Sequence, residues 1–347
     1  MTTLSPEVLD SPAAWRGREM VAQDVWEYRL TEAEVAEVDA AVAAIDRPLI
    51  EVDREAFPLP TLGPKLAGLR RELLDGRGFF LLRGLPVRRM SREEAVAAFW
   101  GIGAHFGSAR SQNAKGHLMG HVKDMGLHSS DPNVRVYQTR ERQLFHTDSV
   151  DIVALMCLQP ARSGGLSSIV SSVAVHNEMA QSRPDLAAEL YEPFFVDRRG
   201  EVPEGMKPWF TLPVFNRVDG ELTTIYTRRY IESARRFEEV PALTPKQVEA
   251  LDLFDSLCNS DEFRLDMAFE AGDMQFLCNH VILHDRTAFE DWPEPERRRH
   301  LLRLWLCPPE GRRLPEAFAA RYGSIRAGDR GGIVVKDAVP VVPLEAA

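Results

Sequence analysis

The stretch LFHTDSVDIVAL, which runs from Leu144 to Leu155, constrains this chain more than any other. It sets His146 and Asp148 two positions apart, directly ahead of an apolar run. Residues i and i+2 of a strand point to the same face, so both side chains reach one point in space if the stretch is extended. A charged pair at the head of a buried strand is costly unless it binds something. An imidazole and a carboxylate are two of the three protein ligands in the 2-His-1-carboxylate set of non-haem Fe(II), which leaves coordination positions open.

The third ligand of such a set has to come from elsewhere in the chain. The segment GDMQFLCNHVILHDRTAF, residues 272–289, is strand-like and carries His280 and His284 four positions apart. Both lie on one face of a regular strand, so spacing alone allows either to be the third ligand. A helical zinc pair is the competing interpretation, but the H-E-x-x-H pattern needs a Glu after the first His, and none is there.

Two arginines follow on the next apolar segment, RRRHLLRLWL, residues 297–306. Arg299 and Arg303 are four positions apart and therefore share one face of a strand. An Arg inside a protein core is costly unless it meets an anion, and a guanidinium binds a carboxylate through two parallel hydrogen bonds. This pair therefore predicts a site for a carboxylate near the candidate ligands.

Other polar residues near these segments have simpler interpretations. Asp151 stands at an odd offset from His146, which puts it on the opposite strand face. If His280 is not the third ligand, it is expected to be a packing residue or a neighbour of the ligands. Arg142 shares the strand face of His146 and faces substrate or solvent. The loop over 111–133 is long for a structureless connection, so it is functional or mobile, and we expect solvated side chains at His117, His121 and His128.

Periodicity and turn signals give the order of elements along the chain. Helices are predicted over 31–45, 66–78, 91–107, 173–190 with a break at Pro184, and 244–260. Strands are predicted over 78–87, 134–139, 144–155 and 163–172, with a hairpin at 212–226 around Asp219-Gly220 and closing strands within 263–286 and 297–309. This order favours an α+β fold. Neither G-x-G-x-x-G after a strand nor a phosphate-binding G-x-x-x-x-G-K-[ST] loop occurs.

Composition narrows the class of protein further. The 347 residues, 44% of them hydrophobic, suffice for one large domain or two small ones. A formal net charge of −10 argues against a nucleic-acid binder. The four cysteines are scattered, as buried residues in a reducing compartment would be. No basic leader followed by an apolar run and no stretch of ~18 apolar residues is present, so we expect a cytoplasmic protein without membrane contact.

The order of these features resembles the TauD/TfdA (taurine dioxygenase-like) family of iron(II)/2-oxoglutarate-dependent dioxygenases. H-x-D comes first, then the Gly-Gly turn of SGGLSSIVSS, residues 163–172, then the distal His and the arginines. The resemblance covers about 79–308 and is strongest in FHTD and in LHDRTAF with RRRHLLRLWL. It implies a double-stranded β-helix (jelly-roll, cupin-like) core flanked by helices. We expect a single catalytic domain over 1–347, with a helical lead-in over 1–78, the core with a helical insert over 79–308 and a C-terminal tail over 309–347.

The resemblance also implies roles for single residues. The family's iron ligands fall on His146, Asp148 and His284, because its distal His precedes a run like RTAF. Its arginine for the far carboxylate of 2-oxoglutarate falls on Arg299. The hydroxyl after the Gly-Gly pair, which assists that co-substrate, falls on Ser167, and Arg303 matches a position that contacts the substrate's acidic group or the co-substrate. The chain departs from its relatives at Cys278, where they often carry Asp or Asn, and at Leu166, where they often carry an acidic residue.

A 2-oxoglutarate-dependent oxygenase consumes molecular oxygen, releases succinate and CO2, and oxidises a substrate C–H bond. The implied partners are Fe(II), 2-oxoglutarate and a small-molecule substrate, acidic if Arg303 serves it; a homo-oligomer is compatible with this. The presence of Asp148 favours hydroxylation or desaturation over halogenation. Two alternatives stay open: a zinc or manganese enzyme on a similar cupin-like fold, and a non-catalytic binding protein. Loops 111–133 and 197–211 are expected to cover the mouth of the site.

Overall fold

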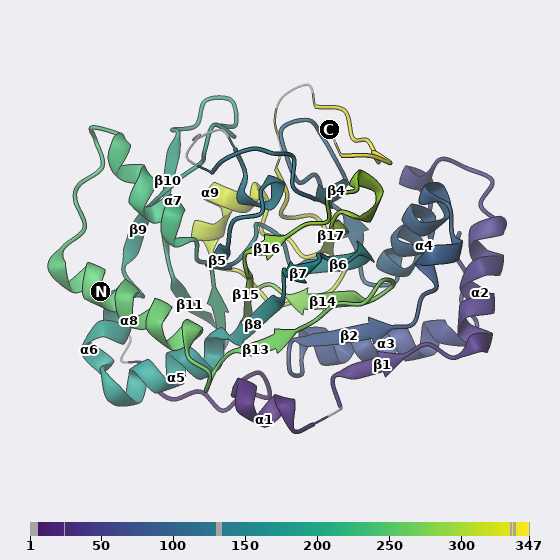
Figure 1. The fold of residues 1–347 in the computed structure, drawn as a ribbon. Helices are drawn as coiled ribbons and strands as arrows, with labels where there is room; N and C mark the ends of the chain where they lie inside the picture. Colours follow the sequence, from purple (N-terminus) through teal and green to yellow (C-terminus); the bar gives the residue numbers. More distant parts are fainter. Residues whose placement is uncertain (1–5, 24, 130–133, 334, 336–337, 347) are drawn as a thin grey trace.

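Two β-sheets form the centre of the molecule, and helices cover them (Figure 1). The structure is a computed structural model, and it describes residues 6–23, 25–129, 134–333, 335 and 338–346. Its helices are α1 (Gly17–Val21), α2 (Glu32–Ala43), α3 (Leu62–Leu74), α4 (Arg92–Ala104), α5 (Ser172–Ser182), α6 (Pro184–Glu189), α7 (Arg228–Ser233), α8 (Pro245–Asn259) and α9 (Ala319–Tyr322). Within these described ranges, no helix is long and apolar enough to cross a membrane.

The larger sheet has seven strands within the described residues. They run in the order β1-β2-β14-β6-β17-β3, with β4 paired to β17 beside β3. Their bounds are β1 (Glu27–Arg29), β2 (Phe79–Arg83), β14 (Met274–Cys278), β6 (Ile152–Gln159), β17 (His300–Cys307), β3 (Ser108–Ala109) and β4 (Met119–Val122). All pairings are antiparallel except β1 with β2. The central strands are buried on both faces, which explains their almost continuous apolar sequences.

The smaller sheet has the order β13-β8-β15-β5. Its strands are β13 (Leu265–Met267), β8 (Ser167–Ser171), β15 (Ile282–Arg286) and β5 (Gln143–His146). Three two-stranded ribbons complete the fold: β9 (Pro193–Asp197) with β10 (Trp209–Pro213), β11 (Phe215–Val218) with β12 (Glu221–Thr224), and β7 (Ser163–Gly164) with β16 (Phe289–Glu290).

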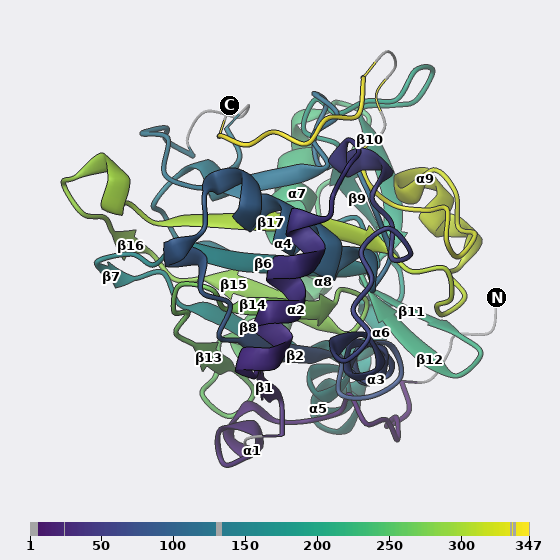
Figure 2. The same ribbon diagram turned by 90° about the vertical axis from the view of Figure 1, so that its right-hand side faces the viewer.

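The two sheets face one another and enclose the site. The hydroxyl of Ser167 on β8 donates to Gln275 Oε1 on β14 at 2.9 Å, which links the sheets across the interior. Helices α3 and α4 pack on the larger sheet, whereas α5 and α8 contact β8 and β5 of the smaller one. In the side view, α2 and α4 lie across the outer side of the larger sheet (Figure 2). This is the expected α+β, double-stranded β-helix architecture with flanking helices.

Local sequence signals located most helix starts and turns correctly. Capping boxes pair Thr31 with Glu34 at the start of α2 and Ser91 with Glu94 at the start of α4, and Thr244 caps α8 as expected. The hairpin turns at Asp219 and Gly220, whose φ angles of 53° and 88° match the turn that two-residue hairpin loops prefer.

Four predictions of secondary structure were wrong. The expected strand at 134–139 is a 3-10 turn, Val136–Gln138. The expected loop 111–133 contains β4, which pairs with β17 because this edge of the sheet is open; residues 130–133 lie outside the described part. The expected helical lead-in contains β1, which pairs with β2. The strand expected at 144–155 is interrupted: β5 ends at His146 and β6 begins at Ile152.

Gly272 and Gly220 offer a matched test of how the turns fix this fold. Both have positive φ, 95° and 88°, but a Cβ on Gly272 would lie 1.8 Å from the carbonyl oxygen of Leu85, whereas one on Gly220 would meet nothing within 4 Å. Gly220→Ala should therefore lower the free energy of unfolding by about 1–2 kcal/mol, the cost of left-handed backbone alone. Gly272→Ala should lower it several times more, as measured by urea unfolding. Equal losses in the two variants would contradict this assignment.

Candidate active site

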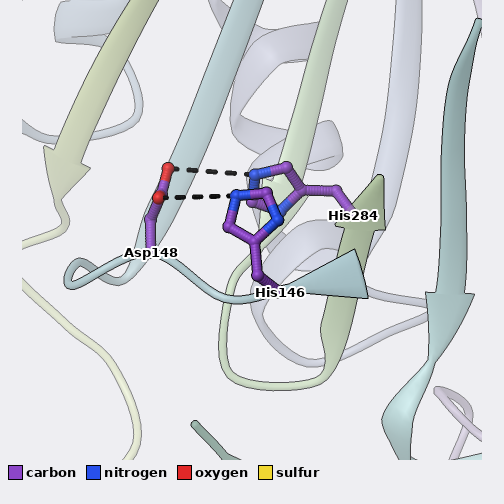
Figure 3. A group of neighbouring side chains, drawn as sticks. All are labelled: His146, Asp148 and His284. Carbon is purple, nitrogen blue, oxygen red and sulfur yellow. Dashed lines mark ion pairs between the residues drawn. The ribbon is translucent and has the colours of Figure 1, made fainter. Parts of the chain in front are cut away.

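His146, Asp148 and His284 converge between the two sheets (Figure 3). Their ligand atoms lie within 4.8 Å of one another. Asp148 Oδ1 is 3.8 Å from His146 Nε2, and Asp148 Oδ2 is 3.8 Å from His284 Nε2. The histidines sit opposite each other on the paired strands β5 and β15. The structure thus brings together the three residues that the sequence singled out for a metal.

Asp148 reaches this cluster from a loop and not from a strand, so the reason given for its position was wrong. Residues 147–151 connect β5 to β6, and the side chain of Asn279 takes the place of a neighbouring strand. Asn279 Nδ2 donates to the carbonyl oxygens of Asp148 and Val150 at 2.7 and 2.8 Å, and its Oδ1 accepts from the Asp148 amide at 2.9 Å. We call residues 147–151 the Asp148 loop.

The carboxylate of Asp148 is kept ionised by its surroundings. Burial by itself raises its pKa, but the nearby Arg303, His284 and His146 and a hydrogen bond from Trp305 outweigh burial, so the pKa is lowered. Trp305 Nε1 donates to Oδ2 at 2.8 Å, and Arg303 Nη1 lies 3.4 Å from the same oxygen. A charged carboxylate is therefore present at neutral pH.

Both histidines turn Nε2 toward the Asp148 carboxylate. His146 Nδ1 donates to the carbonyl oxygen of Leu144 at 2.8 Å, which leaves a lone pair on Nε2, and the Gln143 amide meets that nitrogen at 2.8 Å. Burial, followed by the nearby His146, lowers the pKa of His284 to about 3. A neutral imidazole is the form that coordinates metals. Two imidazoles and one carboxylate whose ligand atoms lie this close together are the ligand types of a 2-His-1-carboxylate Fe(II) site, which leaves coordination positions open.

A small cavity on one side of this cluster carries unpaired positive charge. His146, His284, Ser167, Arg299 and Arg303 all line it, as the sequence predicted for neighbours of one site, and Arg286 lines it as well. Arg299 is only 3% exposed, and among the described residues its Nη1 has no hydrogen-bond partner. Neither Nε nor Nη1 of Arg286 has one there either.

Both guanidinium groups stay charged at neutral pH. Burial, and for Arg286 also the proximity of Arg299, lowers the pKa of Arg299 to about 10 and of Arg286 to about 9. They lie over the ring of Phe289, with centroid distances of 5.1 and 4.9 Å. Asp285 lines the same cavity and Asp291 lies near Arg299, but neither forms an ion pair with these guanidinium groups among the described residues. Buried cations with free donors favour an anion, and a carboxylate suits a guanidinium best.

A second cavity, of about 200 Å³, opens on the other side of the cluster. His146 and Arg303 line both cavities and therefore lie between the two spaces, and Asp148 lines the second one. Its walls are mostly apolar, and Glu201 and Phe210 belong to the loop 197–211 that was expected to cover the site. The charged residues of the far wall pair with one another: Arg135 Nη2 lies 2.6 Å and Arg321 Nη2 lies 4.0 Å from the carboxylate of Glu201.

The structure also places three polar residues outside the cluster whose roles the sequence left open or predicted. Arg142 lines the second cavity, but its Nη2 is paired with Asp285 at 2.8 Å. His121 is buried and hydrogen-bonded to His300 at 2.8 Å, so the prediction of a solvated side chain was wrong. His280 stands in the turn before β15 and bonds to Asp151 at 2.8 Å, which agrees with a packing residue.

Sequence analysis missed Asn279, Trp305, Gln112 and Arg286. Gln112 Oε1 accepts from Arg303 Nε at 2.7 Å and so fixes that side chain between the two cavities. The sequence could have indicated Arg286, because an Arg within a buried strand predicts a bound anion, as it did for Arg299. Asn279 and Gln112 had no such signal, since their roles depend on loops that fold back onto the sheets.

Comparison with known proteins gives independent information about the relatives of this chain. The model of the family "Taurine catabolism dioxygenase TauD, TfdA family" matches residues 45–305. FR-33289 synthase of Streptomyces rubellomurinus (strain ATCC 31215) is 31% identical over 334 residues, which cover 92% of this chain and 98% of that protein. Taurine hydroxylase-like protein SAT17 of Stachybotrys chartarum (strain CBS 109288 / IBT 7711) is 34% identical over 322 residues, 87% of this chain and 82% of that protein.

Solved structures agree with this fold. Asparagine oxygenase in complex with Fe(II), 2S,3S-3-hydroxyasparagine and succinate superposes with a TM-score of 0.63 at 17% identity, covering 81% of this chain and 93% of that one. The non-heme iron oxygenase OrfP in complex with Fe and alpha-ketoglutaric acid gives a TM-score of 0.61 at 15% identity, with the same coverage.

The buried His284 makes a prediction about pH. In the metal-free fold its pKa is about 3, whereas in the unfolded chain it is about 6.5, so the unfolded state binds more protons between these values. The free energy of unfolding should therefore fall as the pH drops from about 6.5 toward 3. In chelator-treated protein, His284→Gln should flatten this slope, and His128→Gln, at an exposed position, should not. A slope left unchanged by His284→Gln would show that its imidazole is not held neutral.

Proposed function

The chain belongs to the taurine catabolism dioxygenase TauD, TfdA family and is an Fe(II)/2-oxoglutarate-dependent oxygenase, and from this premise we propose which of its residues carry the reaction. His146, Asp148 and His284 hold the iron. One observation carries this assignment: their ligand atoms lie within 4.8 Å of one another, and residues of this group line two cavities. When bound, Fe(II) and 2-oxoglutarate supply the oxidising chemistry, in which O2 is consumed and succinate and CO2 are released.

The smaller cavity binds 2-oxoglutarate. Arg299 binds its far carboxylate, because this guanidinium is buried, charged and has a free Nη1 donor among the described residues. Arg286 adds a second cation to the same place. Ser167 presents its hydroxyl from the first strand after the Gly-Gly turn, oriented by Gln275. Arg303 bonds to Gln112 and lies near Asp148, whose carboxylate it keeps ionised. It also lies at the boundary with the larger cavity.

The larger cavity binds the substrate, a small organic molecule that is hydroxylated or desaturated. Its apolar walls exclude water from the reacting carbon, and Arg303 and Arg321 favour a substrate with an acidic group. We treat 1–347 as one catalytic unit, because the main core cluster has buried members from Leu9 to Ile333 and the partly buried Leu344 packs against it. All four cysteines are free and buried, which supports a reducing, cytoplasmic location.

Removal of one ligand tests the metal assignment directly. His146→Ala, Asp148→Ala and His284→Ala should each abolish tight binding of Fe(II), measured under anaerobic conditions by calorimetry, and with it substrate-dependent succinate formation. His128→Gln should bind iron as the wild type does. Tight zinc binding by the wild type, without a visible absorbance band on adding Fe(II) and 2-oxoglutarate, would favour the zinc or manganese alternative. Full activity of His146→Ala would refute the assignment.

The roles of the two arginines differ from those of the metal ligands and need a different assay. Arg299→Gln should weaken binding of 2-oxoglutarate about 100-fold, and Arg286→Gln about 10-fold, because each leaves a carboxylate short of a buried charged donor. Binding of 2-oxobutyrate, which lacks the far carboxylate, should change little. Arg298→Gln, at the exposed neighbouring position, is the matched control. A similar loss of affinity for both keto acids in Arg299→Gln would mean that this residue does not contact the far carboxylate.

A further inference from the structure

The segment after the family match has an unexpected place in the fold. Residues 312–333, here called the C-terminal segment, follow the match, which ends at residue 305, and belong to the range expected to be a tail. They contain α9, which Figure 1 draws in yellow beside β10. From there the segment returns to the Asp148 loop.

The C-terminal segment bonds to successive residues of the Asp148 loop. Arg321 Nε donates to the hydroxyl of Ser149 at 2.5 Å, and the Gly332 amide donates to the carbonyl oxygen of Ser149 at 2.7 Å. The Tyr322 hydroxyl donates to the carbonyl oxygen of Val150 at 3.2 Å. These bonds hold a piece of backbone that belongs to no strand and that would otherwise be free to change its conformation.

The strongest link is an ion pair at the end of the loop. Arg330 Nε lies 2.9 and 3.1 Å from the two carboxylate oxygens of Asp151, and Nη2 bonds to the first of them. Both side chains are buried, with 1% and 2% exposed. Arg330 Nη1 donates to the carbonyl oxygens of Arg312 and Ile325, so the guanidinium also closes the segment on itself. His280 supplies a further bond to Asp151.

The Asp148 loop is thus held from three directions. At its start, Thr147 exchanges hydrogen bonds with the backbone of Tyr226, both at 2.8 Å. Asn279, in the turn between β14 and β15, binds the backbone of Asp148 and Val150, and the C-terminal segment binds Ser149, Val150 and Asp151. A buried ion pair stabilises a fold weakly, because desolvation offsets the attraction, but it does fix geometry. Loss of a partner that orients a metal ligand typically weakens metal binding about 10- to 100-fold.

We propose that the C-terminal segment is a structural part of the metal centre and that Arg330, through Asp151, is a positioning residue for Asp148. This rests on the proposed role of Asp148 as an iron ligand. The same segment lines the substrate cavity through Arg321 and Ile333. One piece of chain outside the matched family region therefore shapes both the metal site and the wall that the substrate meets.

The test measures metal binding in the full-length chain, without turnover. Co(II) is the probe, because calorimetry gives its affinity and its visible spectrum reports ligand geometry. Arg330→Gln should weaken Co(II) binding about 10- to 100-fold and change the spectrum. Asp151→Asn should act similarly, and the double variant should lose no more than the larger single loss, since both changes break the same link. Arg326→Gln is the control: it removes an exposed Arg of the same segment that pairs only with Asp329 among the described residues.

The outcomes separate the inference from the proposed function. If the wild type and Arg326→Gln bind no Co(II), the metal assignment itself fails. If they bind it, but Arg330→Gln binds with unchanged affinity and spectrum, only the positioning role is refuted, even where the melting temperature falls. Should Arg330→Gln fail to fold, Tyr322→Phe replaces it, because this change removes only the hydrogen bond to Val150. That variant should weaken Co(II) binding at least twofold, and unchanged binding would overturn the proposal.

Discussion

A carboxylate buried between two sheets stays ionised only where cations and hydrogen-bond donors surround it, and the centre of this protein is arranged around Asp148. Trp305 and Arg303 come to it from β17, the two histidines from the smaller sheet, and Asn279 fixes the backbone that carries it. Every one of these contacts requires the two sheets to face each other. The jelly roll therefore places the cations and donors that offset the cost of burying this one charged side chain.

In the assignment proposed above, the distribution of paired and unpaired charge separates co-substrate binding from substrate binding within one site. On the co-substrate side, Arg286 and Arg299 keep donors without partners among the described residues, which is unfavourable in the free protein and suits a dianionic ligand. On the substrate side, Arg135 and Arg321 both pair with Glu201, so their positive charge is partly neutralised there. Arg303 stands between them, held by Gln112 and stacked near Tyr137 and Trp305. Binding of one ligand thus need not compete with binding of the other.

Loops supply much of what makes the site specific to this chain. The Asp148 loop belongs to no strand and takes its hydrogen bonds from Tyr226, from Asn279 and from the C-terminal segment, which lies outside the matched family region. A scaffold shared with distant oxygenases therefore carries a ligand whose support is supplied locally. This arrangement agrees with the general pattern in which rigid sheets position catalytic groups and variable connections adjust them.

The sequence by itself determined the residue types and the order that the chemistry needs. H-x-D, a distal His and a buried Arg indicated the family, and capping boxes and the Asp219-Gly220 turn located helices and a hairpin, because these signals act over a few residues. Tertiary structure alone decided that Asp148 arrives on a loop and that His121, Arg286 and Arg330 are buried. Those outcomes depend on contacts between segments more than 100 residues apart, such as Asp148 with Asn279 and Asp151 with Arg330. Local periodicity carries no information about such contacts, since the energy that fixes them appears only when the sheets close.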